Sequence, residues 1–228
     1  MSTSPTTTLS NDTGSNDPGL VPFSRQLREA TEAAHETAER SNFVEHLMEG
    51  RLPLSELARF VRQLHTVYSA LETAVAANDD PVVAPLFVPE LARAGALADD
   101  LEFLAGAEWE SIEVLPATVA YADRIHEVAT WSGGLLAHHY VRYLGDLSGG
   151  QIIGRAIARI YELPDGAGTS AYSFKEIDSP KAFKENYRAQ LDALPWDADE
   201  RARVAVEANV AFQCNSELFR ELSAPRVG

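Results

Sequence analysis

Residues 133–161 (GGLLAHHYVRYLGDLSGGQIIGRAIARIY) have the apolar spacing of a helix, yet their interior contains Gly145, Gly149, Gly150 and Gly154. Each interior glycine costs a helix about 1 kcal/mol relative to alanine. A run of them is typical of a kink, or of a neighbour that must approach the helix backbone closely. Gly145 and Gly149 are four residues apart and share one face. That face suits a second helix or a flat ligand, and spacing alone favours the second helix.

The rest of the chain is also predicted to be helical, because apolar residues after Pro22 recur mostly at helical spacing and strict alternation is rare. Ser24 is a candidate N-cap for the first helix, and the Asn78-Asp79-Asp80-Pro81 break ends the second. We predict an all-α fold with helices over residues 24–40, 55–77, 88–104, 117–130, 134–161, 179–193 and 197–222.

The first twenty residues differ from everything that follows them. They are rich in Ser, Thr, Asn, Asp, Gly and Pro and contain no apolar repeat, so residues 1–20 are expected to be a disordered leader. The remaining length is enough for one domain with a sizeable core and too short for two ordinary ones. We therefore expect a single domain over residues 21–224, with no internal repeat.

The charge, apolar runs and cysteine content of the chain narrow the classes of partner that the protein is expected to bind. Thirty-four acidic and nineteen basic residues give a formal charge of −15, which disfavours nonspecific binding to nucleic acid or to an anionic membrane. No apolar run approaches the roughly 20 residues that span a bilayer, and the N-terminal residues lack the features of a signal peptide. The single cysteine, Cys214, cannot form an internal disulfide. These features favour a cytoplasmic protein without membrane or nucleic-acid partners.

One motif points to a known family. Residues 139–151 (HYVRYLGDLSGGQ) closely resemble the distal-helix signature of haem oxygenases, and chance agreement over the ten letters RYLGDLSGGQ is very improbable. The resemblance extends from about residue 27 to residue 222. It implies an all-helical, single-domain enzyme that holds haem between a proximal and a distal helix.

The first helix is similar to the family's proximal helix. The resemblance assigns His35 as the axial ligand of the haem iron and Glu39, one turn later, as a partner for its second ring nitrogen. Ala30 and Ala34 keep the helix face beside His35 small. Arg28 lies seven residues before the histidine, where the family has a base for one haem propionate, often lysine.

Other segments carry the remaining site residues that the resemblance implies. Lys184 and Arg188 share a helix face and resemble the second propionate-binding segment, and Tyr140 would add a hydroxyl nearby. Phe212 and Phe219 are expected wall residues, although both also suit an ordinary core. The polar positions that the family uses around distal water molecules are matched by Tyr68, Arg142 and Asn215.

The resemblance also implies an activity. Haem b would be substrate and cofactor, and with O2 and electrons from an external reductase or ferredoxin it would yield biliverdin, ferrous iron and carbon monoxide by cleavage at the α-meso carbon. Asp146 is expected to anchor the water molecules that deliver a proton, and the backbone at Gly145 and Gly149 to steer oxygen toward the ring edge. The sequence contains no flavin, nicotinamide or iron–sulfur motif and leaves the oligomeric state open.

Two alternatives remain at this point. A haem-binding or storage protein would keep the fold without turnover. A di-iron carboxylate protein would use the Glu-x-x-His spacing of Glu32 and His35, for which Asp123 and His126 offer the nearest second motif, with aspartate in place of glutamate.

Overall fold

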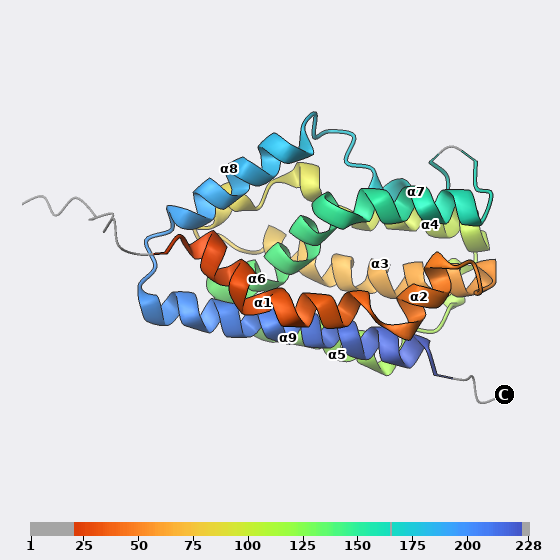
Figure 1. Cartoon of the computed structure of the whole chain (residues 1–228), viewed down its shortest axis with the longest axis horizontal. Helices are drawn as coiled ribbons and strands as arrows, with labels where there is room; N and C mark the ends of the chain where they lie inside the picture. The colour runs from red at the N-terminus through yellow and green to blue at the C-terminus, as the bar shows by residue number, and fades with distance from the viewer. Residues whose placement is uncertain (1–20, 165, 225–228) are drawn as a thin grey trace, which may run out of the picture.

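The computed structural model describes residues 21–164 and 166–224, and in Glu39 only the backbone. These residues form helices and loops and contain no strand, which confirms the all-α prediction (Figure 1). The leader predicted for residues 1–20 lies outside the described residues. The longer helices are α1 (Phe23–Glu39), α2 (Asn42–Met48), α3 (Leu54–Ala76), α4 (Ala94–Ala105), α5 (Pro116–Val128), α6 (Ser132–His139), α7 (Gln151–Ile160), α8 (Pro180–Asp192) and α9 (Ala198–Leu222).

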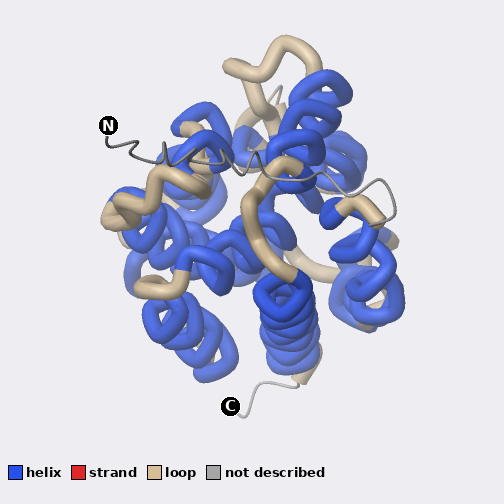
Figure 2. The backbone as a smooth tube through the Cα atoms, turned by 90° about the vertical axis from the view of Figure 1, so that its left-hand side faces the viewer, coloured by secondary structure: helices blue, strands red, loops and turns tan. Residues whose placement is uncertain are grey.

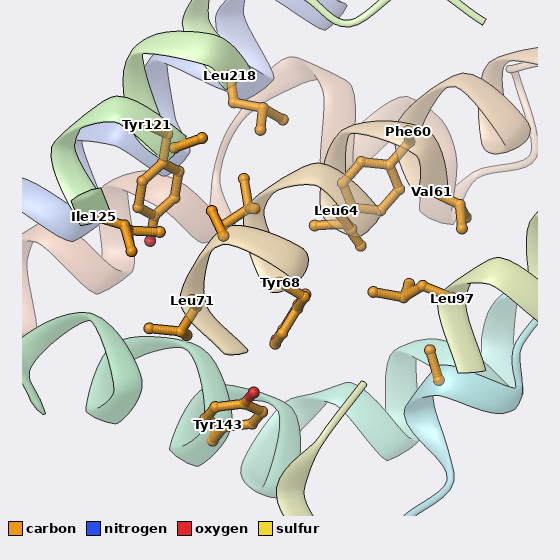
Figure 3. Packing of buried hydrophobic residues seen from close by; sticks show 14 of the residues in the cluster. Phe60, Val61, Leu64, Tyr68, Leu71, Leu97, Tyr121, Ile125, Tyr143 and Leu218 are labelled. Atoms are coloured by element: carbon orange, nitrogen blue, oxygen red, sulfur yellow. The ribbon is translucent and has the colours of Figure 1, made fainter. Parts of the chain in front are cut away.

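Helix α3 is the centre of the first hydrophobic cluster. It buries Phe60, Leu64, Tyr68 and Leu71, which recur every three or four residues and so lie on one face. Figure 3 shows these side chains meeting residues from neighbouring helices, among them Ile125 of α5. This packing places the hydroxyl of Tyr68 in the interior of the molecule.

A second hydrophobic cluster joins α1, α6, α8 and α9. Phe23 and Leu27 of α1 are fully buried against this cluster, which also contains Leu136 of α6, Tyr187 of α8 and Phe212 of α9. Partly buried Ala34 of α1 packs on it as well. Figure 2, turned by 90° from Figure 1, shows the helices in blue and the loops that connect them in tan.

The start of α1 corrects the predicted N-cap. The helix begins at Phe23, one residue before Ser24, and its N-cap Pro22 makes no side-chain capping bond. Instead, the carboxylate of Asp192 in α8 accepts a bond of 2.7 Å from the Ser24 amide and one of 3.1 Å from its hydroxyl. A distant carboxylate therefore satisfies one of the free amides in the first turn of α1, where Ser24 itself was expected to act as the cap.

The glycine-rich segment is one continuous rod with an irregular middle. Helix α6 passes into two π-helical turns, η4 (Tyr140–Leu144) and η5 (Asp146–Gly150), before α7 continues the chain. We call residues 140–150 the π segment. The sequence predicted a single helix over residues 134–161, and the π turns are the departure. Such wide turns inside α-helices occur frequently at functional sites. In Figure 1 this rod climbs from α6, behind α1, to α7.

The other predicted helices are close to the observed ones. Ser179 and Asp197 cap α8 and α9 through their side chains. Helix α4 begins six residues later than expected, because the chain first forms the 3-10 turn η2 (Pro89–Leu91), and α2 was not predicted as a separate helix. No helix among the described residues is long and apolar enough to cross a membrane.

Candidate functional site

Four of the predicted site residues form one hydrogen-bonded cluster. The hydroxyl of Tyr68, on α3, donates to a carboxylate oxygen of Asp146 in the π segment. Arg142 donates from Nε to the Tyr68 oxygen over 3.2 Å and from a terminal nitrogen to Oδ1 of Asn215, on α9, over 2.7 Å. The cluster therefore ties the π segment to two other helices. We call these four residues the distal cluster.

Burial and charge set the protonation states in the distal cluster. Burial raises the pKa of Asp146, while the charge of Arg142 and the hydrogen bond from Tyr68 work against that rise. Burial also raises the pKa of Tyr68 well above its usual range, so the phenol keeps its proton and remains a donor. For Arg142, burial works to lower the pKa, but Tyr68 and Asp146 outweigh it and the guanidinium stays charged.

The two glycines that flank Asp146 face open space. A Cβ atom added to Gly145 or to Gly149 would meet no described atom within 4 Å beyond the helix's own backbone. Spacing alone favoured a second helix against this face, and that prediction is wrong for the described part of the chain. The space beside Gly145 and Gly149 is free for a ligand that needs direct access to the backbone.

The predicted proximal residue lies on the solvent side of α1. His35 is exposed, and its ring stands edge-on to the ring of Phe212 in α9, with 5.7 Å between the ring centroids. Ala34, beside it, packs on the second hydrophobic cluster, to which Val141 and Leu144 of the π segment also belong. The helix that carries His35 and the π segment therefore both border the second hydrophobic cluster.

The predicted cations do not pair with carboxylates. Arg28, Lys184 and Arg188 form no ion pair with any other described residue, in a chain with an excess of acidic groups. Burial raises the pKa of Tyr140, and the charges of Arg188 and Arg28 work to lower it, so both guanidinium groups are within electrostatic reach of this phenol. Lys184 donates to the hydroxyl of Ser148 in the π segment over 3.2 Å.

Glu39 and Phe219 are the two remaining predicted site residues. The side chain of Glu39 is outside the described part of the chain, so its pairing with His35 stays a prediction. Phe219 stacks with Phe43 of α2, at 6.2 Å and 10° between ring planes, and packs on Phe60 of α3. It therefore belongs mainly to the core around α2 and α3, whereas Phe212 borders His35.

Sequence reasoning missed several polar residues behind the distal cluster. Tyr143, inside the recognised motif, donates over 3.2 Å to Glu72 of α3. His138 is fully buried in α6, and its Nε2 lies 3.0 Å from Oε1 of Glu207 in α9. Arg124 of α5 donates to both carboxylate oxygens of Glu207. A buried charged residue in the otherwise apolar stripe of a helix is the signal that could have identified Glu207.

The di-iron alternative finds no support in the described residues. Glu32 and His35 are exposed on α1, and Asp123 and His126 are exposed on α5. Within residues 21–164 and 166–224, no three His, Cys, Asp or Glu side chains come together as a metal site. A di-iron centre needs at least that many converging ligands.

Comparisons with known proteins agree on one family. A family profile described as "Heme oxygenase" matches residues 21–221. The chain is 40% identical over 205 residues to "Heme oxygenase 1" of the cyanobacterium Synechocystis, covering 89% of this chain and 85% of that one. It is 41% identical over 207 residues to "Heme oxygenase 1" of Rattus norvegicus, covering 89% of this chain and 72% of the rat protein.

Solved structures give the same result. The fold is similar to the crystal structure of heme oxygenase-1 from Synechocystis in complex with heme, with a TM-score of 0.84 and 40% identity over 89% of this chain and 93% of that one. It is also similar to the heme oxygenase of Leptospira interrogans, with a TM-score of 0.83 and 37% identity over 88% of this chain and 100% of that one.

Proposed function

Because this chain belongs to the haem oxygenase family, we propose that it degrades haem held between α1 and the π segment, with the distal cluster controlling the proton. The chain is an enzyme of that family, and biliverdin is the product consistent with it. The single observation that carries the site assignment is the distal cluster beside the open faces of Gly145 and Gly149.

The residues present fit haem. A flat ring needs a wall without side chains, and Gly145 and Gly149 offer open space. Two propionates need cations that are not already paired, and Arg28, Lys184 and Arg188 meet that need among the described residues. An iron needs an accessible imidazole, and His35 is exposed on α1 beside Phe212.

We assign to His35 the role of axial ligand, with Glu39 as the acceptor for its other ring nitrogen. A hydrogen-bonded imidazole has a fixed tautomer and is a more basic ligand. When bound, haem supplies the iron that activates O2 and the ring that is opened to biliverdin, ferrous iron and carbon monoxide. Arg28, Tyr140, Lys184 and Arg188 would orient the propionates and so choose the ring edge, which we expect to be α-meso.

The distal cluster would hold and deliver the proton. Asp146 accepts from Tyr68, and its raised pKa moves the carboxyl toward the range in which it takes up and returns a proton. Arg142 fixes the Tyr68 oxygen from the other side and is itself fixed by Asn215. Gly145 and Gly149 let the backbone reach the ligand without an intervening side chain.

Electrons would come from a separate donor, a reductase or a ferredoxin, and we propose that the enzyme works in the cytoplasm. The basic residues that face the proposed propionate edge are the surface best suited to an acidic donor.

Replacing Asp146 with alanine tests the assignment. Purified wild-type protein and the variant receive hemin, the visible spectrum is recorded, and reductant is then added in air. We expect the Soret band to form in both, with biliverdin formation in Asp146→Ala slower by about 100-fold or more because a positioned proton donor is lost. Asp123→Ala, which removes an exposed carboxylate of α5, is the matched control and should behave as wild type.

Each other outcome has a definite meaning. Normal biliverdin formation by Asp146→Ala would overturn the proposed role of the distal cluster. A stable Soret band in wild type without biliverdin would favour a binding or storage protein, and no Soret band would exclude haem as the ligand.

A further inference from the structure

The four glycines of the π segment and α7, at positions 145, 149, 150 and 154, fall into two pairs with opposite surroundings. Gly145 and Gly149 face open space, but Gly150 and Gly154 do not. A Cβ atom on Gly154 would lie 2.6 Å from Cβ and 2.9 Å from Cγ of Tyr172, and one on Gly150 would lie 3.3 Å from its Cδ1. Glycine is thus needed at Gly154 because the backbone of α7 lies directly on Tyr172.

The loop that carries Tyr172 is anchored to α4 by a buried carboxylate. Asp100 accepts hydrogen bonds of 2.7 Å from the amide of Ser170 and 2.9 Å from the amide of Ala171. The hydroxyl of Ser170 donates to the carbonyl of Ala96 over 3.1 Å. The 3-10 turn η6 (Ser170–Tyr172) is therefore held at its first two residues.

A buried arginine holds the same loop on both sides of Tyr172. One terminal nitrogen of Arg93 donates to the carbonyls of Ala171, at 3.3 Å, and Ser173, at 3.0 Å. Its guanidinium lies 4.1 Å from the ring centroid of Phe174. Arg93 is only 8% exposed, so these bonds are shielded from water and fix the loop backbone firmly.

The anchor and the π segment share a common support on α3. The carboxylate of Glu72 accepts from the amides of Arg93, at 2.5 Å, and Ala94, at 3.0 Å, and from the hydroxyl of Tyr143. The Glu72 carboxylate therefore holds both the start of α4 and the middle of the π segment. Tyr172 reaches the segment from the loop that α4 holds.

We propose that Tyr172 is a positioning residue for the reaction: its ring, held by Arg93 and Asp100, supports the π segment from behind and fixes how far Gly145 and Gly149 stand from the haem ring. This inference rests on the proposed function. The segment cannot move toward the loop while the ring fills the space beside Gly150 and Gly154. Burial raises the pKa of Tyr172, and the charge of Asp146 raises it further, so the ring also lies within reach of the distal cluster.

Hydrogen exchange in the ligand-free protein tests the support itself. In Tyr172→Ala, peptides covering residues 144–156 should exchange about 10-fold faster or more, a loss of about 1.4 kcal/mol of local stability. Peptides of α5 should be unchanged. Tyr172→Phe keeps the ring and should match wild type. Tyr161→Ala is the control, since Tyr161 ends α7 and bonds to the carbonyl of Leu52 instead of supporting the π segment.

Product analysis tests the positioning role. With hemin, reductant and air, wild type and Tyr172→Phe should give one biliverdin isomer, and Tyr172→Ala should give a mixture. A support that only stabilises the fold would lower yield without changing the isomer ratio. If Tyr172→Ala loses protection throughout the chain, Tyr172→Leu, which keeps an apolar side chain, replaces it in both measurements.

The outcomes separate this inference from the proposed function. Wild-type exchange over residues 144–156 in the Ala or Leu variant, or an unchanged isomer ratio despite faster exchange, would overturn the positioning role. Failure of wild type to bind hemin or to form biliverdin would instead overturn the proposed function, and the exchange result would still stand.

Discussion

The two sides of the proposed haem site are built in opposite ways. The π segment is connected by side-chain hydrogen bonds to α3 through Tyr68 and to α9 through the pairing of Arg142 with Asn215. Helix α1 packs its apolar face on α9 and α8, while His35, beside Phe212 of α9, remains exposed. One wall is fixed by polar contacts and the other presents its ligand from a surface helix.

This difference matches what each wall has to do. A proton donor must be held to within a fraction of an ångström, and buried hydrogen bonds provide that precision. An axial ligand gains its precision from the metal bond itself, so its helix needs only to be nearby. We therefore expect substitutions in the π segment to alter stability and turnover, and substitutions on α1 to alter haem binding.

The largest expected effect comes from removing the proposed ligand. His35→Ala should abolish the histidine-ligated ferric spectrum while leaving the unfolding free energy of the ligand-free protein near that of wild type, because the side chain is exposed. The measurements are a hemin titration followed by visible absorption, and urea unfolding. His126→Ala, an exposed histidine of α5, is the control. An unchanged ferric spectrum in His35→Ala would show that α1 does not supply the ligand through His35.

Next in size is the loss of the central cation of the distal cluster. Arg142→Ala leaves Asn215 and Tyr68 without their shared donor and removes the positive charge near Asp146, so unfolding of the ligand-free protein should become easier by about 3 kcal/mol. Arg25→Ala removes an exposed ion pair with Glu29 on α1 and should leave the stability close to that of wild type. Equal losses from the two variants would show that the distal wall is no more tightly held than α1.

A pH experiment sharpens the same contrast. Burial alone would raise the pKa of Glu207, but hydrogen bonds from His138 and Arg124 outweigh it and lower the pKa to about 2. A lowered pKa contributes stability above pH 4.5, the ordinary value for Glu, and that contribution is lost as the pH falls toward the folded-state value. Asp146, whose pKa is raised, has the opposite sign and favours the folded state in acid.

Urea unfolding of wild type and Glu207→Gln checks this sign. The variant should be less stable than wild type by about 2 kcal/mol at about pH 7, with the difference shrinking toward about pH 3. A difference that grows in acid would mean that the carboxylate is not held ionised by its partners.

The smallest expected effect concerns the first turn of α1. Asp192→Ala removes the carboxylate that accepts from the amide and hydroxyl of Ser24, which should cost about 1 kcal/mol, as the loss of a helix cap does. Hydrogen exchange should accelerate over residues 22–30 and remain unchanged in the π segment. Asp178→Ala, an exposed aspartate before α8, is the control. Faster exchange in both walls would show that they move as one unit.

The helical class, most helix positions and the family were predictable from the amino-acid sequence alone. Apolar spacing repeats locally, and a cap such as Ser179 or Asp197 acts within its own turn, so both are visible in the chain. The motif of residues 139–151 also named Asp146, Arg142 and, by resemblance, Tyr68 and Asn215, which the structure brings together by hydrogen bonds.

What lies against each helix surface depends on tertiary contacts that the sequence pattern does not show. Four similar glycines divide into two that face open space and two that pack on Tyr172, a residue from a loop about twenty positions away. Asp192 accepts from Ser24 in the first turn of α1, 168 residues earlier in the chain, and Glu207 is held by His138 and Arg124. The π turns were likewise not predicted, since the apolar spacing of residues 134–161 is that of a continuous helix. Such partners are distant in sequence, and no local periodicity encodes them.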